Sequence, residues 1–134
     1  MTRRILLVGI RVLTAASLLY AAIFFKFAGV AYSVALFTKM SEAVHGLISQ
    51  PVFRIGAGIV ETVLAILFLI PKTARLGAAL IVVWMIGPIL SHVFVLGYGS
   101  IFVSALVTFA LPCLYLLLTP RISRGSGAEA KSSG

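Results

Sequence analysis

Long apolar segments, separated by short breaks that contain proline, glycine or charged residues, form the main pattern along this chain. A helix crosses a bilayer core about 30 Å thick with about 20 predominantly apolar residues. Four segments meet that requirement, at about residues 5–25, 52–70, 74–95 and 101–118. The pattern therefore predicts an all-α integral membrane protein, an antiparallel bundle of four transmembrane helices.

The breaks contain residues that begin or end helices. Pro51 suits the first turn of the second helix, and Thr73, after the Pro71 turn, is a candidate N-cap for the third. Pro120 ends the fourth helix, so residues 1–120 are expected to form one transmembrane domain. The remaining segment, 121–134, is small, polar and rich in glycine and serine, and we expect it to be a disordered tail.

The first loop, about residues 26–51, contains a further helical pattern at about 31–48. Apolar residues lie on one side of this helix: Leu36, Phe37, Met40, Ala43, Val44, Leu47 and Ile48. Glu42 and His45 lie on the polar side. The pattern predicts a short amphipathic helix at the outer membrane surface. It either covers the bundle as a surface helix or, with Glu42 and His45, forms a lid over a site between the helices.

Composition excludes several classes of protein. Hydrophobic residues make up 61% of the chain and charged residues 10%, far outside the range of soluble domains. The net charge of +8 is explained by basic residues at the predicted cytoplasmic ends of the helices, so a nucleic acid is not an expected partner. The single cysteine, Cys113, excludes a disulfide within the chain, and no metal-binding pattern is present.

The distribution of basic residues predicts the orientation of the bundle. One side would collect seven of them: Arg3, Arg4, Lys72, Arg75, Arg121, Arg124 and Lys131. The other side would have only Lys26, Lys39 and Arg54. The positive-inside rule then places the N- and C-termini, with the 121–134 tail, in the cytoplasm. We expect the location to be the plasma (inner) membrane of a bacterium.

Two ionisable residues lie inside the predicted spans, where charges usually face the bundle interior and find partners. The helical rise places Glu61 about 13 Å from the outer side and Arg11 about 9 Å from the inner side. If the first two helices are neighbours, these side chains can meet. One interpretation is a structural Arg11–Glu61 ion pair that fixes the register of the helices; the other places Glu61 on the floor of a pocket.

A second group of polar residues lies towards the outer side. Lys26 ends the first helix, Arg54 begins the second and His92 lies late in the third. Each has an ordinary explanation, since lysine and arginine reach towards the interface and histidine often packs in a helix bundle. The alternative is one outward-opening ligand-binding pocket formed by Lys26, Arg54, Glu61, Trp84 and His92, with Glu61 as a candidate proton relay.

The third helix also contains a helix-breaking residue beside this group. Pro88 cannot donate a backbone hydrogen bond, which frees the carbonyl of Trp84 and favours a kink near His92. The indole N–H of Trp84 would need a partner near the middle of the membrane. In the fourth helix, Ser100, Ser104 and Thr108 recur every four residues, a pattern more typical of close helix packing than of chemistry.

These residues resemble the DoxX-like family of small four-helix membrane proteins. The matching pieces are Arg11, Lys26-Phe-Ala-Gly29, Gly56-x-Gly-x-x-Glu61, Ile70-Pro-Lys-Thr-Ala-Arg75 and Ser91-His-Val-Phe-Val-Leu-Gly97, which together cover about residues 10–118. The resemblance implies a four-helix bundle. Some members are subunits of a thiosulfate:quinone oxidoreductase, others accompany membrane oxidoreductase complexes, and an animal relative is an assembly chaperone for nicotinic receptors. Redox-associated relatives use cysteine pairs, which this chain lacks.

Three functions are therefore open. The first is a quinone-interacting, redox-associated accessory subunit that works with a partner redox protein, with quinone as its only candidate cofactor. His92 and Lys26 or Arg54 would hydrogen-bond the quinone oxygens, and Glu61 would relay a proton. The second is a non-catalytic membrane scaffold or assembly chaperone, and the third is binding or transport of a small lipophilic molecule. A homo-oligomer in the lipid bilayer is compatible with each.

Overall fold

The computed structural model describes residues 2–120 and is all-α in that range. Its elements, in chain order, are α1 (Thr2–Tyr20), η1 (Ala21–Phe27), α2 (Ala31–Ala43), α3 (Gln50–Leu69), α4 (Ala74–Ser91), η2 (His92–Leu96) and α5 (Ser100–Leu118). The segments η1 and η2 are π-helical and continue α1 and α4 without a break. Such wider helical turns are rare and occur frequently at functional sites.

Four continuous helices in the described part of the chain are long and apolar enough to cross a membrane. They are Thr2–Phe27, Gln50–Leu69, Ala74–Leu96 and Ser100–Leu118. Together with the short helix α2 between the first two, they confirm the predicted fold class, a bundle of four candidate transmembrane helices. Many large apolar side chains on the outer faces of the helices are exposed, as expected where lipid is the solvent.

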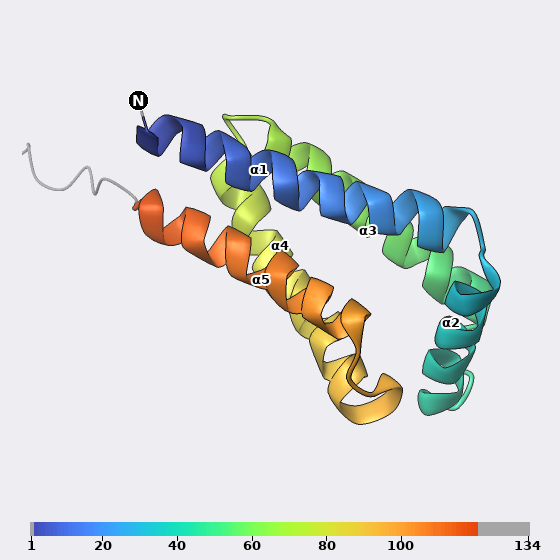
Figure 1. Cartoon of the computed structure of the whole chain (residues 1–134). Coiled ribbons are helices and arrows are strands. Elements are labelled where there is room, and N and C mark those ends of the chain that lie inside the picture. The colour runs from blue at the N-terminus through green and yellow to red at the C-terminus, as the bar shows by residue number, and fades with distance from the viewer. Residues whose placement is uncertain (1, 121–134) are drawn as a thin grey trace, which may run out of the picture.

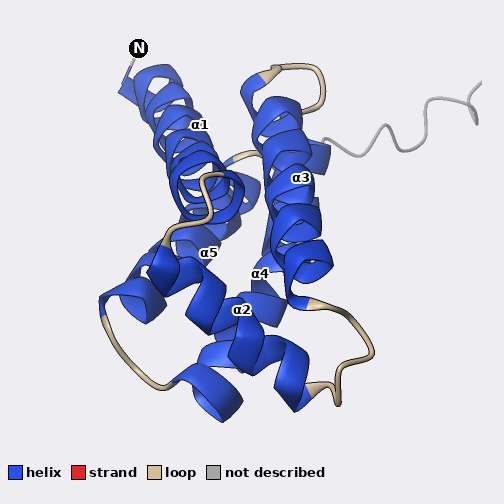
Figure 2. Cartoon of the chain, turned by 90° about the vertical axis from the view of Figure 1, so that its right-hand side faces the viewer, coloured by secondary structure: helices blue, strands red, loops and turns tan. Residues whose placement is uncertain are grey.

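The helices form two pairs that meet at one end of the molecule and diverge at the other. In Figure 1, α1 and α3 lie side by side, and α4 and α5 form the second pair. We call the end with the α3–α4 turn the closed end, and the end with α2 and the α4–α5 turn the open end. Figure 2 looks onto the open end and shows α2 lying across it.

The closed half of the bundle has a filled core. Phe68 of α3 and Ile81 of α4 are completely buried, and the Phe68 ring meets Tyr115 of α5 edge to face at a centroid distance of 5.0 Å. Small residues in the same core, Ala65 and Ala78, are also completely buried and allow α3 and α4 to approach closely. Ile10, Ala15 and Leu18 of α1 belong to the same core, so packing holds all four spans together.

Arginines at the closed end bind the carbonyl end of α5. Arg3 donates a hydrogen bond to the carbonyl of Leu118, and Arg75 donates to that of Leu116 at 3.5 Å. The last carbonyls of a helix have no partner within it, so the Arg3 bond satisfies one of them, whereas the Leu116 carbonyl also accepts from the Thr119 amide at 3.3 Å. The predicted tail, 121–134, lies outside the described residues, and the cytoplasmic location of the closed end stays a prediction.

The helix in the first loop is shorter than predicted. It ends at Ala43 instead of residue 48, and His45 and Gly46 adopt left-handed backbone conformations with φ of 54° and 72°. The Gly46 amide donates to the carbonyl of Ser41 at 2.8 Å, a bond typical of helix termination at glycine. The helical periodicity beyond Ala43 was therefore misleading, because this glycine stops the helix before the apolar pattern ends.

Candidate functional site

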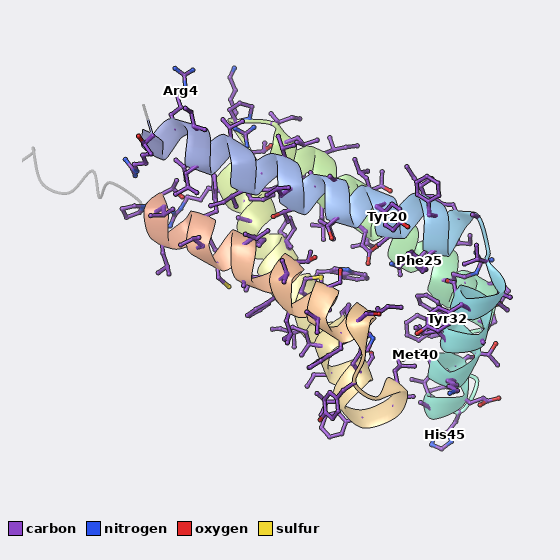
Figure 3. The ribbon with its side chains drawn as sticks, viewed as in Figure 1. Arg4, Tyr20, Phe25, Tyr32, Met40 and His45 are labelled. Atoms are coloured by element: carbon purple, nitrogen blue, oxygen red, sulfur yellow. The ribbon has the colours of Figure 1, made fainter. Side chains whose placement is uncertain are left out.

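A cavity of about 750 Å³ lies between the two helix pairs, towards the open end. All seven elements contribute to its wall, which is mostly apolar and aromatic. Figure 3 shows Phe25 and Met40 among the side chains at this end of the molecule, and both line the cavity. Volume and lining are typical of a binding site for a small lipophilic molecule.

A buried ion pair forms part of the cavity wall. The Lys26 ammonium donates to Glu61 Oε2 at 2.6 Å, and the two side chains are only 12% and 6% exposed. It is the only ion pair that the structure shows within residues 2–120. Glu61 therefore has a cationic partner inside the bundle, as the first interpretation required, although that partner is Lys26. Glu61 also borders the cavity, as the second interpretation required.

The predicted Arg11–Glu61 ion pair is not formed. Arg11 Nε donates to the carbonyl of Phe68 at 3.0 Å, and a second guanidinium nitrogen donates to the carbonyl of Leu69. The prediction was wrong because α1 brings Arg11 opposite the last turn of α3, whose carbonyls lack helical partners. Glu61 lies seven residues earlier in α3, about 10 Å farther towards the open end.

The π-helical segment η1 carries Lys26 onto the face of α3 that contains Glu61. Gly58 makes this approach possible, because a Cβ at its position would lie 2.7 Å from the Phe27 ring and 3.1 Å from Lys26 Cβ. Both values are too close for ordinary packing, so any side chain at residue 58 would push η1 away. Gly58, about one turn before Glu61 in α3, is thus part of what allows the ion pair to form.

Arg54, predicted to bind a ligand, does not line the cavity. Its guanidinium donates to the backbone carbonyl of Lys26 and lies beside Gly29, where a Cβ would be 3.2 Å from the nearest guanidinium nitrogen. Gly29 has a φ of 64°, a left-handed conformation that suits glycine. Arg54 therefore fixes the end of η1 and positions Lys26 from behind, away from the cavity surface.

Trp84 does lie in the cavity wall, as the sequence suggested. Its buried indole N–H lies near the Glu61 carboxylate but meets the geometry of a hydrogen bond with no described residue. Ser33 of α2, 2% exposed, also lines the cavity, and its buried hydroxyl has no partner among the described residues. Buried donors usually have partners, so two unpaired ones in one wall indicate a place for a ligand's oxygen atoms.

His92 lies in the wall at the start of η2 and is 7% exposed. Its Nδ1 is 2.9 Å from the carbonyl of Pro88. A carbonyl oxygen only accepts hydrogen bonds, so Nδ1 carries the proton and donates. In the neutral ring Nε2 is then an acceptor, and it has no hydrogen-bond partner among the described residues. The helix distortion predicted beside Pro88 takes the form of the π-helical segment η2.

The helix α2 contributes to the cavity through residues other than those predicted. Glu42 and His45 are exposed and do not line the cavity. Figure 3 shows His45 at the tip of the loop beyond α2, turned away from the space between the helix pairs. The residues of α2 that line the cavity are Tyr32, Ser33, Leu36, Phe37 and Met40. Their helical spacing is the signal in the sequence that would have identified Ser33.

The serine and threonine residues of α5 divide between packing and the cavity. Thr108 and Ser17 of α1 share a hydrogen bond at 3.0 Å, so this position does join two helices as the pattern predicted. Thr108 also lines the cavity, as do Ser100, Ser104 and Ala105. The small side chains of Ser100 and Ser104 thus leave space for the cavity at the open end. Thr108, closer to the closed end, joins α5 to α1.

Comparison of the chain with protein-family models, with curated proteins and with solved structures gives no match. The fold and the cavity define the class, an integral membrane protein with four candidate transmembrane helices and a buried site between them. The resemblance to the DoxX-like family rests on the sequence motifs alone and stays a prediction. No group of three His, Cys, Asp or Glu side chains that could hold a metal ion occurs within residues 2–120.

Proposed function

We propose that this protein binds a small lipophilic molecule with a polar head in the cavity between its two helix pairs. The observation that carries the proposal is a cavity of about 750 Å³ whose mostly apolar wall contains two donors, on Trp84 and Ser33, that have no partner within residues 2–120. Buried polar groups of Thr14, Gln50 and Arg54 also lack partners among the described residues, but only Trp84 and Ser33 combine an unpaired donor with a place in the cavity wall. The cavity thus supports binding over a purely structural role.

The polar groups of the cavity wall would each form a different hydrogen bond with the head of the ligand. The Trp84 indole and the Ser33 hydroxyl would donate to oxygen atoms of the head, and His92 Nε2 would accept from a hydroxyl. The Lys26–Glu61 pair lies beside them, with Glu61 able to exchange a proton with a hydroxyl that approaches its carboxylate. Aromatic and aliphatic side chains would surround the rest of the molecule.

A quinone is the ligand that we propose within this class. Its carbonyl oxygens match the unpaired donors, its reduced form offers hydroxyls to His92, and the resemblance to the DoxX-like family favours it. The protein would then be an accessory subunit that presents the quinone to a partner redox protein, which supplies or removes the electrons. Transport of another lipophilic molecule through the same cavity is the alternative that this geometry also serves.

We expect saturable binding of a short-chain quinone analogue in its reduced, dihydroxy form to the purified protein, with affinity about tenfold lower in His92→Ala. The physical reason is the loss of one buried hydrogen bond, worth about 1 kcal/mol or slightly more. Trp84 is the only tryptophan of the chain, so quenching of its emission reports binding at the cavity.

The chain offers a matched control for this experiment, because its other histidine, His45, is exposed and far from the cavity wall. His45→Ala should bind the analogue as the wild type does. Absence of saturable quenching, or equal losses in the two histidine variants, would refute the proposal of a quinone site at His92.

A further inference from the structure

Residues of both α1 and α5 line the cavity. Figure 1 shows these helices diverging towards the open end. The Ser17–Thr108 hydrogen bond joins them at 3.0 Å. Beyond that bond, Tyr20 and Ala21 border the cavity on one side and Ser104 on the other. The segment η1 packs against α1, α2 and α3, whereas α5 packs against α4 and α1.

Most of the side chains that border the cavity along this gap are small. Ser17 and Ala21 face the cavity from the α1 side, and Ser104 and Ala105 face it from α5. The nearby aromatic ring of Tyr20 turns instead towards its neighbours in the same helix, Phe24 and Phe25, at centroid distances of 5.0 and 5.7 Å. Tyr20 and Ser104 line the cavity and are also exposed, so the cavity comes close to the surface of the bundle between α1 and α5.

This gap lies at membrane depth. Ser17 and Ser104 both belong to helices that are long and apolar enough to cross a membrane. The neighbours of Ser104 on the outer face of α5, Val103 and Val107, are more than half exposed, as expected for side chains in contact with lipid. An opening at this level faces hydrocarbon instead of water, so a molecule dissolved in the bilayer can reach it directly.

The charges in the wall restrict what can enter. Within residues 2–120, Lys26 and Glu61 are the only lysine, arginine, aspartate or glutamate side chains that line the cavity, and they neutralise each other. A charged head would have no counter-charge there, and an unpaired charge in an apolar environment is costly. The cavity is thus suited to a head without net charge.

We infer that the ligand is an uncharged amphiphile dissolved in the bilayer, which enters sideways between α1 and α5 with its polar head first and leaves its apolar chain in the lipid. This inference rests on the proposed function and adds the route of entry and the charge of the head. It explains why the donors of Trp84 and Ser33 remain unpaired inside a wall that opens to lipid. Ser104 is then a residue of the entrance and Val103 is not.

The experiment uses the full chain in phosphatidylcholine vesicles, with a fatty alcohol that carries bromine near its hydroxyl as the probe. Bromine quenches tryptophan on contact, and Trp84 is the only tryptophan. We expect saturable quenching in the wild type, loss of most of it in Ser104→Phe, and no loss in Val103→Phe. The brominated fatty acid of equal length, added at a pH at which it is ionised, should quench more weakly than the alcohol.

A second version of the experiment tests whether the loss of quenching in Ser104→Phe comes from a folding defect. Ser104→Cys and Val103→Cys, each combined with Cys113→Ser, receive a bulky thiol-reactive label after the protein has been reconstituted. The label at residue 104 should block quenching, and the label at residue 103 should not. Equal quenching with both labels would refute entry between α1 and α5, and stronger quenching by the ionised acid would refute an uncharged head.

The outcome is separable from that of the quinone experiment. If a quinone analogue binds in detergent but neither bromine probe gives saturable quenching in vesicles, the sideways entrance is refuted and the proposed function stands. If the alcohol quenches with the expected dependence on Ser104 while no quinone binds, the entrance stands and the quinone assignment is refuted.

Discussion

Glu61→Ala and Lys26→Ala are each expected to lower the free energy of unfolding by about 3–5 kcal/mol, because each leaves the opposite charge buried without a partner. The two side chains are 6% and 12% exposed, and their charged atoms are 2.6 Å apart. Unfolding in mixed micelles, followed by circular dichroism, measures the effect. Lys39→Ala, which removes an exposed lysine of α2, is the control and should change stability by less than about 0.5 kcal/mol.

The double variant Lys26→Met with Glu61→Leu separates the structural from the functional role of the pair. Replacing a buried ion pair with apolar side chains is often neutral or stabilising, so the double variant should be more stable than either single variant. It should nevertheless bind the quinone analogue more weakly than the wild type, since the cavity loses its proton-exchanging carboxylate. Two small single effects, or a double effect equal to their sum, would show that the ion pair is not coupled in the folded protein.

The partner of Glu61 illustrates what the sequence could and could not predict. A carboxylate inside a spanning segment requires a partner, and that requirement follows from the sequence alone. Which cation supplies it depends on the rotation and spacing of neighbouring helices. Counting the rise of a regular α-helix placed Arg11 within reach, but Arg11 binds the end of α3. The π-helical turns of η1, which turn Lys26 towards Glu61, have no signature in hydropathy.

The bundle itself was more predictable than the site. Four apolar segments of spanning length, separated by proline and glycine, leave few alternatives to a four-helix arrangement. Of the residues expected around a pocket, Lys26, Glu61, Trp84 and His92 do lie in one cavity wall. Ser33 and Ser104 were not expected there, because the divergence of the helix pairs is a property of the whole fold and not of any one segment.

Gly77→Ala is expected to lower the free energy of unfolding by about 3 kcal/mol, at the upper end of the range for overpacking in a core. A Cβ at this position would lie 2.7 Å from the backbone nitrogen of Phe68 and 2.9 Å from the carbonyl carbon of Leu67. Both atoms belong to the backbone of α3, so no side chain can rotate away to make room. The α3–α4 hairpin would have to separate at the closed end.

Gly9→Ala is the matched control for that substitution. Gly9 also lies within a helix, but a Cβ at its position would have no neighbour within 4 Å, so alanine should stabilise α1 by about 0.5–1 kcal/mol. The contact at Gly77 sets how closely the two helix pairs meet, and their divergence from there forms the cavity. Gly77→Ala should therefore also weaken ligand binding, whereas Gly9→Ala should not. If Gly77→Ala and Gly9→Ala had equal stability, the close contact of α3 and α4 would not be what holds the closed end together.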